Sequence, residues 1–217
     1  MPQKYTWKHF LTKARESLDL ISDPQTEEEW VSATYDDLAA RAVTAWRDDN
    51  PIVVKSWNQL DTAAKQAIAS PSSVTKVGKL AFKYMKVAGF MSLVMKLPSG
   101  HKLIYPKAHV KKDKEKGWGS SIYFWGVIPN SGGKWGWCST YGGKLLENCT
   151  QATAGDVMRH GMECAEKEGY LAFMLVHDEI LTLMESGQTH ERLCKQAPWM
   201  KGLPLAAEGG QLPFYKK

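Results

Sequence analysis

Residues 170–184, YLAFMLVHDEILTLM, place three ionisable side chains between two apolar runs. The runs, Tyr170–Val176 and Ile180–Met184, have the length and composition of buried β-strands. The residues between them are His177, Asp178 and Glu179. This pattern predicts a β-hairpin that carries carboxylates at its tip, where they suit a hard cation such as Mg²⁺ but are too few to complete an octahedral site. The simpler interpretation of the spacing is a polar turn between two core strands.

Upstream of this hairpin, residues 144–168 carry apolar side chains at steps of three or four, or at near-helical steps, which indicates one helix face. The apolar positions are Leu145, Cys149, Ala152, Met158, Met162 and Ala165. Gly169 follows, and glycine is favoured just after the last turn of a helix. We therefore expect a long helix that stops at Gly169 and leads directly into the hairpin.

The middle of the chain has the two-residue period of strands. The expected strands are Val74–Val77, Ala81–Tyr84, Phe90–Leu97, His101–Tyr105, Ser121–Ile128 and Lys134–Ser139. Turn sequences separate them, the clearest being residues 97–100, LPSG, and residues 130–133, NSGG. The charged run at residues 111–116, KKDKEK, is expected to be solvated. The middle should therefore consist of antiparallel hairpins.

The first part of the chain has helical patterns. Residues 5–20 are expected to form one helix, and Thr26-Glu27-Glu28-Glu29 is a capping-box start for a second, which reaches Asp49 with a break near Thr34. Proline favours the first turn of a helix, so a third is expected over residues 51–69. A short helix should also cover residues 189–196.

These elements predict an α+β fold in which helices pack on antiparallel hairpins. The expected divisions are a helical segment (1–73), a basic hairpin region (74–139), and a segment with the long helix and the carboxylate-bearing hairpin (140–217).

The charge of the chain is concentrated in its centre. The whole chain has a net charge of +5, but residues 51–144 hold fifteen lysines and three acidic residues, a net charge of +12. Such a block is typical of a surface that binds a polyanion, although it can also be an ordinary solvated surface. Aromatic residues in the same region can stack nucleobases or can form the core on one face of a hairpin. They are Trp118, Tyr123, Phe124, Trp125, Trp135 and Trp137.

Several classes of protein are excluded. With 43% hydrophobic and 24% charged residues, the composition is that of a folded domain. The four cysteines form no CxxC pair, so reduced structural thiols are expected. The longest apolar run falls far short of the ~20 residues that span a bilayer, and the N-terminus lacks a signal-peptide core, so we expect a cytoplasmic protein without membrane contact. Gly143-Lys144 lacks the first glycine and the Ser or Thr of a P-loop.

Several collinear stretches carry a family resemblance. They are residues 42–47 (AVTAWR) with Asn50-Pro51, residues 97–100 (LPSG) with Tyr105-Pro106, residues 139–152 (STYGGKLLENCTQA), residues 175–180 (LVHDEI) and residues 202–209 (GLPLAAEG). Together they resemble the phage members of the family A (Pol I-like) DNA polymerases, over about residues 36–217. In this resemblance LVHDEI matches motif C. The implied fold is the C-terminal part of a polymerase right hand, the end of the fingers with part of the palm.

The resemblance implies roles for the hairpin tip. Asp178 would be one of two metal-binding aspartates in two-metal nucleotidyl transfer, with Glu179 as a weaker ligand. His177 would contact the phosphate or backbone at the primer terminus.

It also implies contacts to primer–template DNA. Gln151, Glu147 and Asn148 would face the minor groove near the primer end, where contacts test pair shape without reading sequence. Lys102 and Lys107 are candidates for phosphate contacts, which position the duplex.

The sequence also departs from the family. It has no DYS-like motif A and no RxxxKxxxxxxYG motif B, and Met1 falls about where the fingers helix would have ended. Gly155 stands where many relatives carry arginine. The expected function is therefore that of the palm-bearing subunit of a split DNA-directed DNA polymerase. This subunit would use dNTPs and would share two Mg²⁺ ions with a partner chain that carries motifs A and B. If the chain is phage-encoded, the enzyme would act in the host cytoplasm. The alternative is a non-catalytic DNA-binding module that kept the palm scaffold.

Overall fold

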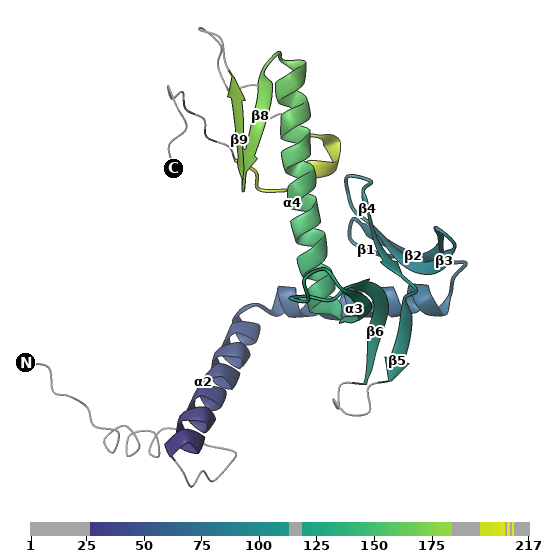
Figure 1. Cartoon of the computed structure of the whole chain (residues 1–217), viewed down its shortest axis with the longest axis vertical. Coiled ribbons are helices and arrows are strands. Elements are labelled where there is room, and N and C mark those ends of the chain that lie inside the picture. The colour runs from purple at the N-terminus through teal and green to yellow at the C-terminus, as the bar shows by residue number, and fades with distance from the viewer. Residues whose placement is uncertain (1–26, 113–118, 184–195, 207, 209, 211–217) are drawn as a thin grey trace, which may run out of the picture. The chain divides into compact units, whose positions relative to one another are not determined.

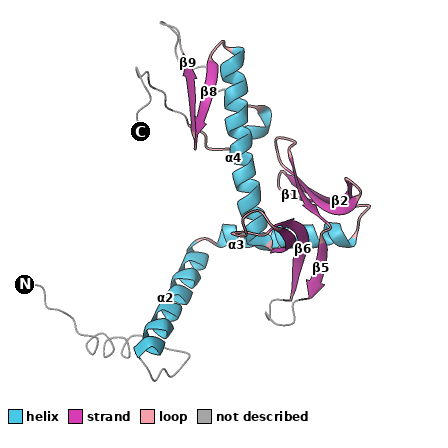
Figure 2. Cartoon of the chain, viewed as in Figure 1, coloured by secondary structure: helices cyan, strands magenta, loops and turns pink. Residues whose placement is uncertain are grey.

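The computed structural model describes residues 27–112, 119–183 and 196–206, with Glu208 and Gly210. The chain divides into two compact units, residues 1–55 and 56–217, which are described separately. The expected helices at 5–20 and 189–196, and Thr26 of the expected capping box, lie outside the described residues. The described elements are helices and antiparallel sheets, as the α+β expectation required, and the expected divisions at residues 73 and 139 stay predictions (Figures 1 and 2).

The main element of the first unit is helix α2 (Glu27–Asp49). The expected break near Thr34 is wrong, because the helix runs unbroken through this position, which has neither glycine nor proline around it to interrupt the hydrogen bonds. Asp37 and Arg41 form an ion pair of 2.7 Å one turn apart. At the end of the helix, the side-chain amide of Asn50 donates a hydrogen bond to the carbonyl of Trp46 (2.8 Å).

Helix α3 (Pro51–Ala69) supplies one wall of the core in the second unit. Its buried stripe is Leu60, Ala63, Ala64 and Ala67. Three of these four are alanines, so a sheet can approach the helix closely. The expected helix over residues 51–69 is confirmed.

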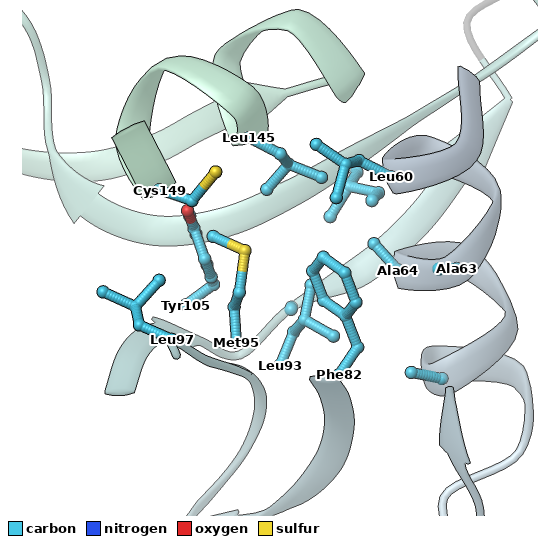
Figure 3. Close-up of a cluster of buried hydrophobic side chains, with 13 residues drawn as sticks. Leu60, Ala63, Ala64, Phe82, Leu93, Met95, Leu97, Tyr105, Leu145 and Cys149 are labelled. Carbon is cyan, nitrogen blue, oxygen red and sulfur yellow. The ribbon is translucent and has the colours of Figure 1, made fainter. Parts of the chain in front are cut away.

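Four antiparallel strands form a meander against α3. They are β1 (Val74–Val77), β2 (Leu80–Val87), β3 (Phe90–Lys96) and β4 (Lys102–Pro106), in the order β1-β2-β3-β4. Alternate residues of these strands enter the core, as the two-residue period predicts. Figure 3 shows Phe82, Leu93 and Met95 from the sheet close to Leu60 and Ala64, with Leu145 and Cys149 above them.

A second sheet has the strand order β5-β6-β7, with β5 (His109–Lys112), β6 (Ser120–Val127) and β7 (Trp135–Thr140). It joins the same core through Ile122 and through Phe124, whose ring meets that of Tyr105 edge-on at 5.1 Å. Lys111 and Lys112 of the charged run are exposed, as expected, and they pair with β6 as the end of β5. All four residues of this edge strand are exposed, so they lack the apolar alternation that identifies a strand.

Helix α4 (Gly142–Lys167) follows β7 and starts two residues earlier than expected. Its N-terminus lies against α3, because a Cβ built on Gly142 would come within 1.9 Å of the carbonyl oxygen of Trp57. Gly169 ends the helix as expected, with a left-handed φ of 88° and its N–H donating to the Glu166 carbonyl (3.0 Å). The last sheet is the antiparallel pair β8 (Leu171–Val176) and β9 (Glu179–Leu183).

No helix among the described residues is both long enough and apolar enough to cross a bilayer.

Candidate active site and nucleic-acid interface

The β8–β9 hairpin has the expected position, with a tighter tip than the sequence suggested. Val176 pairs with Glu179, so the connection consists of His177 and Asp178 alone, and Glu179 is the first residue of β9. All three ionisable side chains are exposed. His177 adopts a left-handed φ of 53°. This conformation is uncommon for a residue other than glycine and stores strain, which is often found at functional sites.

The donor chemistry of the tip suits a hard divalent cation. Asp178 and Glu179 both offer carboxylate oxygens, the ligand type that Mg²⁺ prefers. Within the described parts of the chain, no cluster of three or more His, Cys, Asp or Glu side chains is arranged to hold a metal ion. Two adjacent carboxylates can therefore anchor such an ion, and its remaining ligands would have to come from water, substrate or other polypeptide.

The hairpin lies on α4 and leaves much apolar surface in contact with solvent. The side chain of Ile180 packs against the helix, since a Cβ on Gly161 would lie 2.9 Å from its Cδ1 atom. Several large side chains of the two strands are nevertheless about half exposed or more. They are Leu171 (61%), Phe173 (54%), Leu175 (48%) and Leu183 (59%). Among the described residues, this hairpin thus carries an apolar face that the chain itself does not cover.

The first half of α4 presents the residues expected to meet the minor groove. Glu147 and Gln151 are exposed, and Glu147 lies 3.9 Å from Lys144. The Asn148 amide instead donates a hydrogen bond to the hydroxyl of Tyr105 (3.1 Å). Burial raises the pKa of Tyr105 above its ordinary value, so this phenol stays protonated at neutral pH. Asn148 therefore connects α4 to β4, and Glu147 and Gln151 remain on the surface.

Gln151 and the hairpin tip lie near each other along α4. Ten residues separate Gln151 from Gly161, about 15 Å at the rise of an α-helix. Strand β8 runs back along α4, so the tip projects from Ile180 toward Gln151 by two residues, about 7 Å. Their separation along the helix axis is thus about 8 Å.

Lys102 belongs to a sheet face whose charged side chains are all lysines, a feature that could not be recognised before the strand pairing was known. Strand register places four exposed lysines on the face of the first sheet that points away from α3, namely Lys76, Lys83, Lys96 and Lys102. Strands β1–β4 contain no acidic residue. We call these four residues the lysine face. In the sequence, the lysine face is visible only as lysines that alternate with apolar residues. The strand pairing is needed to show that these lysines share one surface.

Lys107 occupies a different place, in the connection between β4 and β5. It has a left-handed φ of 54°. Its ammonium lies 4.6 Å from the ring centroid of Phe90 and 5.3 Å from that of Trp125. Lys102 thus lies on the lysine face of the first sheet, whereas Lys107 lies over aromatic rings from both sheets.

A buried carboxylate that the sequence analysis missed holds the 97–101 turn against α4. Asp156 is only 2% exposed and accepts hydrogen bonds from three side chains. The donors are the Ser99 hydroxyl, the His101 Nδ1 atom (3.0 Å) and the Arg159 guanidinium (2.6 Å). Asp156 continues the stripe of Leu145, Cys149 and Ala152 at helical spacing. An acidic residue on an otherwise apolar helix face indicates a buried carboxylate that needs hydrogen-bond partners, and this pattern could have identified it.

Comparison with known proteins finds one informative similarity. The chain is 35% identical over 180 residues to a DNA polymerase of Bacillus phage SP02. The match covers 81% of this chain and 27% of the phage protein, so the chain spans about a quarter of that relative's length. No protein-family model matches the chain, and no solved structure matches it.

Proposed function

We propose that this chain is the palm-bearing, C-terminal part of a family A DNA-directed DNA polymerase. The observation that carries the proposal is an exposed His177-Asp178-Glu179 tip on a hairpin packed against a long helix, in a chain similar to a phage DNA polymerase over most of its length. Asp178 serves as one of two metal-binding aspartates, and Glu179 assists it. Two Mg²⁺ ions, when bound, supply the charge that stabilises the attacking and leaving oxygens of nucleotidyl transfer.

The other residues of this chain position the DNA. His177 lies beside Asp178, where it contacts the primer-terminal phosphate. Glu147 and Gln151, on the exposed surface of α4, face the minor groove of the terminal base pairs. The lysine face holds phosphates of the duplex, which fixes position without reading sequence.

A second polypeptide segment completes the site. Two adjacent carboxylates supply too few ligands for two octahedral Mg²⁺ ions, so in this proposal the second aspartate comes from a motif A segment, together with the motif B residues that handle the dNTP. The exposed side chains of Leu171, Phe173 and Leu175 offer this segment an apolar surface beside Asp178. We propose that the segment belongs to a partner chain in the host cytoplasm.

A second candidate function is a non-catalytic DNA-binding module. The observation that favours it is the lysine face, which needs neither metal nor a partner chain to attract duplex DNA. Under this function Asp178 would have no role in DNA binding.

Primer extension tests the proposal and separates the two functions. Extension is measured with this chain alone and with the complex that it forms with a co-expressed neighbouring gene product carrying motifs A and B. The complex should extend the primer, and Asp178→Asn should lower incorporation by several orders of magnitude while duplex binding is retained. Asp36→Asn, an exposed acid of α2, is the matched control and should have no effect.

Three outcomes would contradict the polymerase assignment in different ways. Near-normal incorporation by Asp178→Asn would remove the motif C role. Robust extension by this chain alone would show that it needs no partner. Tight duplex binding without extension, even in the complex, would favour the DNA-binding module.

A further inference from the structure

The three-stranded sheet has a second face that the proposed polymerase site does not use. Register and alternation direct Ile122 and Phe124 of β6 into the core. Tyr123, Trp125 and Val127, which alternate with them, lie on the outer face together with their cross-strand partners, among which Trp137 is 52% exposed and Trp135 is 61% exposed. The sequence pattern allowed the aromatic residues of this region to form a core or to stack nucleobases; in the structure Phe124 faces the core, whereas Trp135 and Trp137 lie on the outer face. Trp118 lies outside the described residues.

The aromatic rings on the outer face form a continuous row. Trp125 and Trp137 meet edge-to-face at 5.5 Å between centroids. Trp137 meets His109 in the same manner at 5.0 Å, and His109 stacks on Tyr123 at 6.0 Å. Four rings from three strands are therefore arranged side by side on one surface, which we call the aromatic face.

Two lysines lie against this row. The Lys107 ammonium is 5.3 Å from the ring centroid of Trp125, and the Lys111 ammonium is 5.7 Å from that of Tyr123. Strands β5–β7 contain no aspartate or glutamate. Among the residues of these three strands, the face therefore combines exposed or partly exposed aromatic rings with positive charge and no negative charge.

This combination favours nucleic acid over a protein as the occupant. Lysine is depleted in protein–protein interfaces, whereas surfaces that bind single strands pair aromatic rings, on which bases stack, with cations for the phosphates. A duplex keeps its bases paired and stacked inside the helix, so it cannot use the rings of an open sheet face. Charge complementarity and ring exposure together point to an unpaired strand.

We propose that the aromatic face binds single-stranded nucleic acid. Bases stack on Tyr123, Trp125 and Trp137, and the Lys107 and Lys111 ammonium groups contact the adjacent phosphates. The proposal goes beyond the polymerase assignment and does not depend on it, because none of these rings belongs to the hairpin tip or to α4.

The test measures how a fluorescent oligothymidylate of about 12 nucleotides binds to the full chain. Fluorescence anisotropy gives the affinity at each of a series of salt concentrations. Trp125→Ala and Trp137→Ala should each weaken binding about tenfold, the loss expected when one base loses its stacking partner. Trp137→Phe keeps a ring and should retain most of the affinity. Lys111→Ala should reduce the log–log salt slope by about 0.7, the value for one phosphate contact on a single strand.

Two controls separate this proposal from instability and from the polymerase function. Trp46→Ala removes a tryptophan of α2 that is 46% exposed, and it should bind the oligonucleotide as the parent does. Asp178→Asn should also leave this binding unchanged, whatever it does to primer extension. Circular-dichroism melting of every variant establishes that the fold is retained.

The proposal would be overturned if Trp137→Ala, correctly folded, bound the oligonucleotide as tightly as the parent. It would equally be overturned if the parent chain bound none. Self-association in sedimentation that depends on Trp137 and excludes the oligonucleotide would assign the face to a second copy of this chain.

Discussion

The two ends of helix α4 have different surroundings. Near its N-terminus, Leu145 and Cys149 are buried in a core shared by α3 and two sheets. Near its C-terminus, the helix supports a two-stranded hairpin on which Leu171 and Leu175 are about half exposed or more. The first region buries its apolar surface within this chain, whereas the second leaves it to be covered. We infer that the N-terminal region dominates folding stability and that the hairpin is specialised for contacts with other molecules.

Truncation of one leucine in each region should show the largest contrast. Leu60→Ala opens a cavity in the shared core and should lower the free energy of unfolding by about 3 kcal/mol. Leu175→Ala removes a side chain that is 48% exposed and should cost below about 1 kcal/mol in the isolated chain. Urea denaturation of the two variants measures both values.

Equal losses at the two positions would mean that the hairpin is as well packed as the core. In the complex with a partner chain, Leu175→Ala should weaken association although it barely changes the stability of the chain alone.

Removal of the Asp156 carboxylate should have an intermediate effect. Asp156→Ala leaves Ser99 and His101 without their buried acceptor and should lower the free energy of unfolding by about 2 kcal/mol. The change should be visible as a lower midpoint of urea denaturation. Glu163→Ala, which removes an exposed acid one turn past Arg159, is the matched control and should change little. A midpoint equal to that of the parent would show that the 97–101 turn is held by other contacts.

The smallest expected effect is an increase in stability, at Gly155. Gly155 lies in the interior of α4, and a Cβ added at this position would have nothing within 4 Å, so alanine fits there without a clash. Gly155→Ala should raise the free energy of unfolding by about 1 kcal/mol, because glycine costs a helix more conformational entropy. Thermal melting would detect the shift. A lower melting temperature would mean that this helix has to bend or open at Gly155.

Periodicity predicted most of the elements, because local spacing determines helices and strands. It failed where the deciding interaction is distant. Strand β5 is an exposed edge whose pairing with β6 gives no local signal. The two-residue period showed which side chains of β6 share a face. Which of the two faces is buried depends on where α3 and α4 pack.

The candidate site could be predicted in part for the same reason. The hairpin and its ionisable tip are contiguous in sequence, so they were identified directly. Two of the three partners of Asp156, His101 and Ser99, are 55 and 57 residues away along the chain, and the lysine face requires the register of four strands. The roles of Asp178, Glu179 and His177, the Mg²⁺ ions and the partner chain stay predictions.

The contact between Gly142 and the carbonyl of Trp57 has a consequence for how relatives of this protein should vary. Both partners at this crossing are backbone, so no change of side chain elsewhere can make room for a larger residue at 142. Gly142 is thus required by the architecture, and Asp178 by the proposed chemistry. A descendant that keeps the glycine and has replaced the aspartate would have retained the scaffold after catalysis was lost. These two positions together would therefore sort active enzymes from inactive derivatives in a genome survey.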